Sequence, residues 1–408
     1  MFLSLLLFDM KSFDVIERFS EAGLLFRDPV MSGHYVWRQK GMVLVERLCG
    51  QFENVCETQQ RIRHVTPDTF MDGISYQTFY EHVADYANVY CSLNGEVVVR
   101  PENTRALLAS LSLEGPEIIA LTNTPLYRQF QTKPFLVDQR IWPALGMAQR
   151  VSPPELEKTR DHLWNNVQCF FASCLLPVLW VRQEKGFKGF ADDMLLPLTS
   201  EDTDALTVVS TLFTLSTQMT ASTFPEQRVL QYGFSERLLY CYARMQEDRP
   251  VVVWPSEVTP IQLSVSSSLS RWADQYPEFA EFRVGENQED APIVLWDEGG
   301  KIQYSVRVTG EQGTLESPGQ VRELLRKSDA WIEHNNKQYF DRTLSANKVQ
   351  SFCADCTDRL EGYTSVGEVF PRQQAVCEHC ETPHAFLQVF VPTTTHRTIN
   401  EKLTKKTV

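Results

Sequence analysis

The sequence has no apolar segment long enough to span a bilayer. A spanning helix needs about 20 predominantly apolar residues, and the longest candidate, residues 169–181, is shorter and contains Pro177. Residues 1–8 form another apolar run, but no basic flank precedes it and no small-residue cleavage site follows. We therefore expect no membrane segment, and we interpret residues 1–8 as a buried N-terminal strand.

The sequence also lacks an excess of positive charge. It contains 39 Lys and Arg against 52 Asp and Glu, which gives a net charge of -13. Sequence-independent attraction to a phosphate backbone requires positive charge. The charge balance therefore argues against nucleic acid as the main partner, although it is compatible with a local basic patch.

Close cysteine pairs are absent from most of the chain. The sequence has no internal repeat and no low-complexity segment. Six of the ten cysteines are scattered through apolar surroundings: Cys49, Cys56, Cys91, Cys169, Cys174 and Cys241. Such residues are typical of buried free thiols in a reducing compartment. This pattern predicts a cytoplasmic location.

The remaining four cysteines form two Cys-x2-Cys pairs near the C-terminus. They are Cys353 with Cys356 and Cys377 with Cys380, and twenty residues separate the pairs. Two thiolate pairs at this spacing can close a tetrahedral zinc site, and four thiolates leave no open position for catalysis. The sequence therefore predicts a structural zinc. Two neighbouring histidines can be alternative ligands, donors to the ligands or simply exposed residues: His379 and His384.

The length and the hydrophobic patterns indicate more than one core. A chain of 408 residues with 43% hydrophobic residues can bury two or three cores, because single cores rarely exceed about 250 to 300 residues. Apolar spacing predicts helices at 41–54 and 103–113 and strands at 62–67, 96–100, 118–128 and 135–141. These elements favour a mainly antiparallel sheet. Further on, strand signals at Val251, Ile293 and Ile302, with a helix signal at Leu269, predict a compact α/β domain.

Several short segments resemble one protein family in their sequences and in their order along the chain. The segments 33–37 with Pro67, 122–128 with 134–136, and 233–237 resemble the first, second and third class II motifs. Residues 254–262 resemble the entry into an anticodon-binding domain, and 377–385 a last zinc-binding knuckle. Across roughly residues 25–395 the chain resembles prolyl-tRNA synthetase of the type with a C-terminal zinc-binding domain, a class II aminoacyl-tRNA synthetase.

The resemblance implies an α+β chain of three parts. Residues 1–250 are expected to form a class II synthetase-like catalytic domain built on an antiparallel sheet. Residues 251–345 are expected to form an anticodon-binding-like α/β domain, and residues 346–408 a zinc-binding module and tail. Residues 41–56 would mediate a homodimer if the dimer of the family persists.

The same resemblance locates residual active-site candidates. Amino-acid activation needs an Arg on the α-phosphate, a carboxylate on the adenine amino group and an Arg stacked on adenine. Arg128 matches the first of these groups and Arg237 the last, but Phe130 stands where the family has the glutamate. The following basic run is reduced to Arg140, and Arg105 stands near the place of a proline-binding carboxylate. Arg128 and Arg237 are therefore candidates for nucleotide binding. The alternatives are a structural role at a strand end for Arg128 and an ion pair with Glu236 or a neighbouring helix for Arg237.

Two classes of function follow. The first is a catalytically degenerate prolyl-tRNA synthetase paralogue that acts as a non-catalytic binding or accessory subunit. The alternative is a divergent proline-tRNA ligase, or another ATP-dependent amino-acid-activating enzyme, in which Arg128, Arg140 and Arg237 hold ATP with magnesium. Acidic residues at 286–290 and 297–298 and the net charge do not favour tRNA, so a protein partner is expected.

Overall fold

The computed structural model describes residues 15–27, 29, 35–56, 62–66, 68–80, 90–100, 103–114, 118–127, 141–184, 190–202, 205–235, 237–269, 279–353, 355–356, 362–370, 375–384 and 387–392. The chain divides into two compact units, which are described separately. The first unit comprises residues 1–52, 169–177 and 242–338, and the second comprises 53–168, 178–241 and 339–408. The strand expected at residues 1–8 lies outside the described residues.

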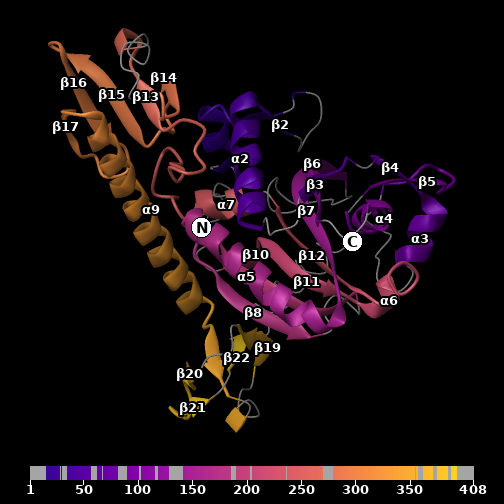
Figure 1. Cartoon of the computed structure of the whole chain (residues 1–408). Helices are drawn as coiled ribbons and strands as arrows, with labels where there is room; N and C mark the ends of the chain where they lie inside the picture. Colours follow the sequence, from indigo (N-terminus) through magenta and orange to yellow (C-terminus); the bar gives the residue numbers. More distant parts are fainter. Residues whose placement is uncertain are drawn as a thin grey trace, which may run out of the picture. The chain divides into compact units, whose positions relative to one another are not determined.

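A large sheet forms the second unit (Figure 1). In spatial order its strands are β18 (Gln350–Phe352), β22 (Gln388–Pro392), β19 (Tyr363–Val369), β8 (Leu179–Glu184), β9 (Ala191–Asp202), β11 (Ser210–Leu215), β12 (Arg228–Ser235), β7 (Ile141–Val151), β6 (Ile118–Tyr127) and β3 (Ile62–His64), with β10 (Ala205–Val208) paired to β9. The pairings are antiparallel except that β3 runs parallel to β6. The expectation of a mixed α+β fold with an antiparallel sheet is confirmed.

Helices predicted from apolar spacing appear at their expected places. The helix expected at 103–113 is α4 (Thr104–Glu114), which packs against β6 and β7. Leu107, Leu108 and Leu111 share one face of α4 and are buried in the core of the second unit. Other described helices before residue 245 include α2 (Gln39–Cys56), α3 (Gly73–Tyr80), the 3-10 turn η2 (Pro153–Glu155), α5 (Leu156–Ser173), α6 (Thr217–Thr220) and α7 (Arg237–Arg244).

A smaller mixed sheet forms part of the first unit. Its strands, in spatial order, are β14 (Val284–Glu286), β13 (Leu263–Val265), β15 (Ile293–Glu298), β16 (Lys301–Val306) and β17 (Gln312–Thr314). β13 is parallel to β14 and β15, and the other pairings are antiparallel. The strands predicted at Ile293 and Ile302 are confirmed. The helix signal at Leu269 coincides with the end of the 3-10 turn η4 (Ser267–Leu269), and residues 270–278, where that helix would continue, lie outside the described residues. The long helix α9 (Pro318–Ala346) follows the sheet.

The strand predicted at Val251 is wrong. Residues 252–255 are buried but form no strand, because a side chain takes the place of a partner strand. The fully buried Gln246 amide donates from Nε2 to the carbonyl of Val253 at 3.0 Å and accepts from the Val253 N–H at 3.1 Å. The backbone polar groups of Val253 are thereby satisfied without a ladder.

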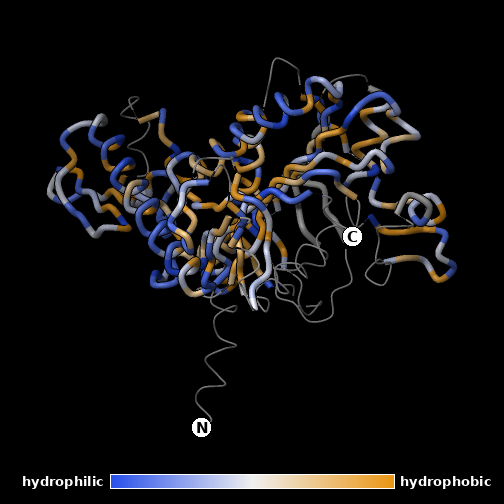
Figure 2. Tube along the Cα trace, turned by 90° about the horizontal axis from the view of Figure 1, so that it is seen from below, coloured by the Kyte–Doolittle hydropathy of each residue, from blue (hydrophilic) through white to orange (hydrophobic). Residues whose placement is uncertain are grey.

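Three small two-stranded ribbons complete the described fold. β1 (Leu25–Arg27) pairs with β2 (Tyr35–Trp37), β4 (Phe70–Asp72) with β5 (Val97–Val99), and β20 (Ala375–Val376) with β21 (Pro383–His384). No helix among the described residues is both long and apolar enough to cross a membrane. Hydrophilic residues recur along the helices in Figure 2.

A buried carboxyl in the first unit makes its stability depend on pH. Asp329 of α9 accepts hydrogen bonds from the N–H and the hydroxyl of Ser256. Burial raises the pKa of Asp329, and the bonds from Ser256 only partly oppose that rise. Because the folded-state pKa exceeds the unfolded one, this group adds stability below about pH 4, and the addition disappears as pH rises through the folded pKa.

We expect Asp329→Asn to remove this component. The free energy of unfolding of the wild type, relative to the variant, should fall as pH is raised from about 3.5 to 7 in urea titrations. Asp290 stays in both proteins, and burial raises its pKa as well, so only the difference between the two curves reports Asp329. A difference that grows with pH would contradict the assignment.

Candidate metal centre

The four paired cysteines lie on two short segments of the second unit. Cys353 follows β18, and Cys377 follows β20. The ribbon of β20 and β21 brings the chain back on itself, so the segment from Cys377 to Cys380 forms a tight turn. Two hydrogen bonds close this turn: Thr382 O accepts from Cys377 N–H at 3.0 Å, and Cys377 O accepts from Glu381 N–H at 2.9 Å. The sequence places the second pair of thiols on a rigid knuckle.

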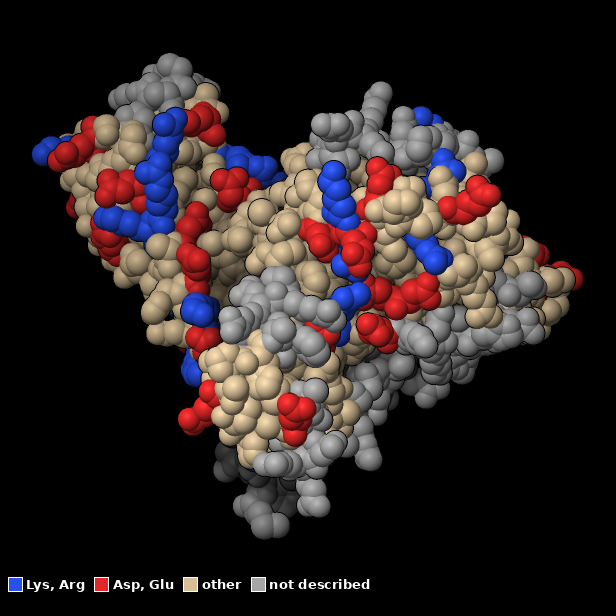
Figure 3. Space-filling model, turned by 60° about the horizontal axis from the view of Figure 1, so that its bottom comes forward, with Lys and Arg blue, Asp and Glu red and all other residues tan. Residues whose placement is uncertain are grey.

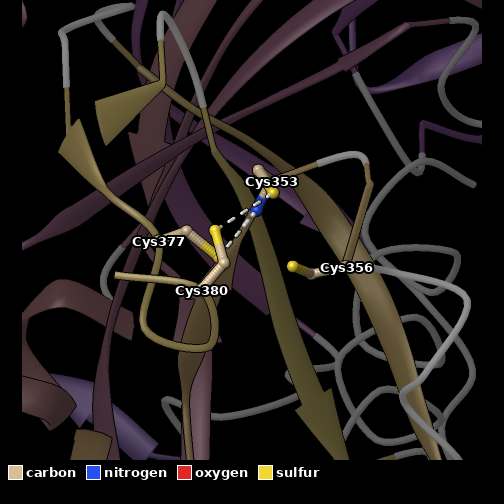
Figure 4. Close-up of side chains that lie close together, drawn as sticks. All are labelled: Cys353, Cys356, Cys377 and Cys380. Atoms are coloured by element: carbon tan, nitrogen blue, oxygen red, sulfur yellow. Dashed lines mark hydrogen bonds between the residues drawn. The ribbon is translucent and has the colours of Figure 1, made fainter. Parts of the chain in front are cut away.

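The four thiol sulfurs gather around one point. All four Sγ atoms lie within 4.8 Å of one another, and Figure 4 shows the side chains converging from both segments. The Sγ atoms of Cys353 and Cys380 are 3.9 Å apart. A tetrahedron with zinc–sulfur bonds of about 2.3 Å has sulfur–sulfur edges of about 3.8 Å. The cluster therefore already has nearly the size that a zinc ion requires.

Backbone contacts tie the two segments together beneath the sulfurs. The N–H of Cys353 donates to Cys377 Sγ at 3.4 Å, a contact that stabilises negative charge on the sulfur. Ser351 and Glu378 exchange two further bonds of 3.1 Å, from Glu378 N–H to Ser351 O and from Ser351 N–H to Glu378 Oε1. The two pairs of thiols are held together by protein contacts in addition to any metal.

The thiols differ in acidity. Hydrogen bonding with Thr382, followed by His384, lowers the pKa of the Cys380 thiol to about 5, so this residue is a thiolate at neutral pH. Burial, together with the neighbouring thiols, raises the pKa of Cys356 to about 12. A bound divalent cation reverses this, because a coordinating thiol gives up its proton. Metal binding is accordingly expected to release protons.

Apolar side chains surround three of the four sulfurs. Phe352, Leu387 and Phe390 pack with Cys353, Cys356 and Cys377 in a small core, and these cysteines are buried whereas Cys380 is exposed. Together, the distances and the donor set fit a metal such as zinc. Four sulfur ligands leave no position for a substrate, so the ion would be structural.

The two histidines beside the cysteines have different surroundings. Nε2 of His384 lies 3.5 Å from Cys380 Sγ, which suits a donor to a ligand better than a replacement for it. The ring of His379 packs edge-on against Phe352, with 6.3 Å between the ring centres. The metal-binding group found among the described residues contains cysteines alone.

Of the three arginine candidates, the described residues include Arg237. Arg128 and Arg140 lie outside the described residues. Arg237 is the first residue of α7, its side chain is 1% exposed, and its Nη1 donates to Thr207 Oγ1 at 2.8 Å. Its contact with β10 depends on the tertiary fold and has no signal in the local sequence.

Sequence patterns identified the ligands but not the residues that position them. Ser351, Glu378 and Thr382 carry the contacts that close the knuckle and join the two segments. The one available signal was the tripeptide Glu-Thr-Pro at 381–383, which is typical of a turn. Glu381 indeed has a φ of +57°, in the left-handed region that a tight turn uses.

No family model and no curated protein matches this chain.

Proposed function

We propose that this chain is a class II synthetase-like scaffold, related to prolyl-tRNA synthetase, that works by binding a partner and no longer activates an amino acid. The arrangement of the motif-like segments supports the scaffold. β6 carries the second-motif residues 122–127 and lies beside β7, and β7 lies beside β12, which carries the third-motif residues 233–235. An active site that combines these two motifs needs them close together, and the two segments are far apart in sequence.

One observation carries the loss of catalysis. Arg237, which would stack on adenine, is 1% exposed and donates to Thr207. Stacking requires one face of the guanidinium to be open to the ligand. In the sequence, moreover, Phe130 stands in place of the carboxylate that would bind the adenine amino group, and a phenyl ring accepts no such hydrogen bond.

Surface charge supports a protein partner over tRNA. Glu286 and Glu289 of the first unit are exposed, as are Asp297 and Glu298. Arg283, which precedes these acids in sequence, points its guanidinium at the carbonyl oxygens of Thr259 and Ser256. On the face shown in Figure 3, Lys and Arg are interspersed with Asp and Glu. A phosphate backbone is attracted by clustered positive charge, which this mixture does not provide.

The zinc ion has a structural role in this proposal. The cysteine cluster lies next to β18 and β22, and β22 pairs with β19, which pairs with β8. A metal at Cys353, Cys356, Cys377 and Cys380 would fix one margin of the large sheet. A homodimer through residues 41–56 stays part of the proposal and would show as twice the chain mass in sedimentation experiments.

The proposal is tested by ATP–pyrophosphate exchange on zinc-loaded protein, with proline and then with each other amino acid. The proposal predicts exchange no faster than a blank. Exchange that depends on one amino acid would revive the alternative, an ATP-dependent ligase. Thr207→Val, which removes the hydroxyl bonded to Arg237, is the matched variant, because it would raise any activity that the burial of Arg237 suppresses.

A further inference from the structure

The outer face of the β4–β5 ribbon in the second unit carries exposed apolar side chains. Directly opposite residues of an antiparallel pair share a face. Met71 is paired with Val98, and both pack into or against the core of the unit. Phe70 lies opposite Val99, and Val97 opposite Asp72, so these residues share the other face. Phe70 is 58% exposed and Val97 42% exposed.

The turn that precedes β5 and the start of α3 carry two more exposed apolar side chains. Leu93 is fully exposed at the tip of the turn, and Ile74, two residues after β4, is 71% exposed. A group of exposed large apolar side chains of this size is typical of an interaction site. We use the term ribbon face for Phe70, Ile74, Leu93 and Val97.

Hydrogen bonds brace the turn of the ribbon face. Ser92 Oγ donates to Asn94 Oδ1 at 2.6 Å and accepts from Val97 N–H at 3.1 Å, and Gly95 closes the turn with a φ of +73°. Gly73 N–H donates to Glu96 O at 2.8 Å, and a Cβ on Gly73 would lie 1.9 Å from Gly95 O. Because these bonds hold the backbone of the turn, binding loses less backbone entropy than it would for an unbonded loop.

Charge around the ribbon face identifies its partner. Between Arg63 and Arg100 the sequence contains no Lys or Arg and five Asp or Glu. Three of these acids are described and exposed: Asp68, Asp72 and Glu96. Hydrogen bonds from Ser75, with a smaller contribution from the charge of Arg105, lower the pKa of Asp72, so its carboxyl is charged at neutral pH.

We propose that the ribbon face docks a basic amphipathic segment of a partner protein, with apolar side chains against Phe70, Leu93 and Val97 and Lys or Arg against the three carboxylates. A second copy of this chain fits less well, because it would set acidic rims against each other. The proposal goes beyond the function proposed above, because it rests on other residues and would hold for an enzyme as well.

The probe is a labelled amphipathic peptide of about 15 residues with Leu at helical spacing and Lys elsewhere. Fluorescence anisotropy with the full-length protein measures its affinity, and a peptide with Glu in place of Lys is the control. We expect the Lys peptide to bind, the Glu peptide not to bind, and affinity to fall with added salt. Hydrogen exchange should slow at residues 70–72 and 90–99.

Two surface variants separately test the apolar contacts and the charge of the ribbon face. Phe70→Ser with Leu93→Ser removes apolar contacts, and Asp68→Asn with Asp72→Asn and Glu96→Gln removes charge while keeping the acceptors of the turn. Each should weaken binding at least about tenfold, which corresponds to about 1.4 kcal/mol. All of these positions are exposed, so the fold should tolerate the changes.

A charge-matched variant elsewhere decides whether binding is specific. Glu289→Gln with Asp297→Asn and Glu298→Gln removes three exposed acids from the first unit and should leave affinity within about twofold. Equal affinity for all variants would overturn the proposal, because the peptide would then bind any acidic surface. Conversion of a wild-type dimer into a monomer by the apolar variant would also overturn it, because a second copy would then cover the face.

Discussion

Cys377→Ser is expected to reduce the zinc content of the purified protein from about one ion per chain to none. Cys377 is fully buried, and its sulfur accepts the N–H of Cys353, so a hydroxyl cannot take over its place. Structural zinc in small cysteine sites contributes about 10 to 16 kcal/mol of apparent binding free energy. Loss of the ion should therefore unfold the segments that carry the cysteines.

Elemental analysis and hydrogen exchange measure this prediction together. Exchange should accelerate in β18 and β22, and also in β19, which joins them to β8. Cys169→Ser is the matched control, because Cys169 is exposed and belongs to the first unit; it should keep its zinc. Full zinc content in Cys377→Ser would contradict the four-cysteine site.

Asp193→Ala is expected to lower the free energy of unfolding by about 3 to 5 kcal/mol. Asp193 of β9 accepts from Arg160 Nη1 at 2.7 Å and from Arg182 Nε at 2.7 Å. The side chains of all three residues are largely buried, with at most 19% exposed. Removal of the shared carboxylate leaves two desolvated guanidinium groups without their common counter-charge.

The neighbouring Asp192 provides the control. Asp192 is exposed on the same strand, and Asp192→Ala should change the free energy of unfolding by no more than about 0.5 kcal/mol. Urea denaturation of both variants at neutral pH gives the comparison. If both variants lose the same small amount, the carboxylate of Asp193 does not hold α5 to the sheet through Arg160.

Residue spacing predicted the elements that depend on short-range sequence patterns. The helix expected at 41–54 is α2, and Leu44, Leu48 and Phe52 are buried on one face, because their spacing matches the helical repeat. The cysteine spacing likewise predicted the cluster, since two Cys-x2-Cys pairs supply the four thiolates of a tetrahedral zinc site. Neither prediction required knowledge of distant contacts.

β7 could not be predicted in the same way. Residues 145–149 are buried without interruption, because neighbours cover both faces of the strand, so its sequence shows no alternation. Pro143 and Gly146 further disguise it, since both residues are rare inside strands. The strand predicted at 135–141 meets the described strand only at Ile141, and residues 135–140 lie outside the described part of the chain.

At the margin of the large sheet, the sequence did not predict which strands pair. The zinc-binding region was predicted as a module of its own, and its separation from the other parts stays a prediction. Its strands β18, β22 and β19 nevertheless continue the sheet through β8. The pairing of Glu368 with Arg182 and of Val369 with Val181 joins segments far apart in sequence, and no local pattern reports such a pairing.

Calorimetric titration of ATP and magnesium into zinc-loaded protein, with and without proline, decides whether the chain has lost its nucleotide site. We expect no heat of binding and no thermal stabilisation at about millimolar ATP, because Arg237 donates to Thr207 and the adenine-binding carboxylate is missing. Binding in the micromolar range that is lost in a folded Arg237→Lys variant would contradict this expectation, because the chain would then have kept a working nucleotide site.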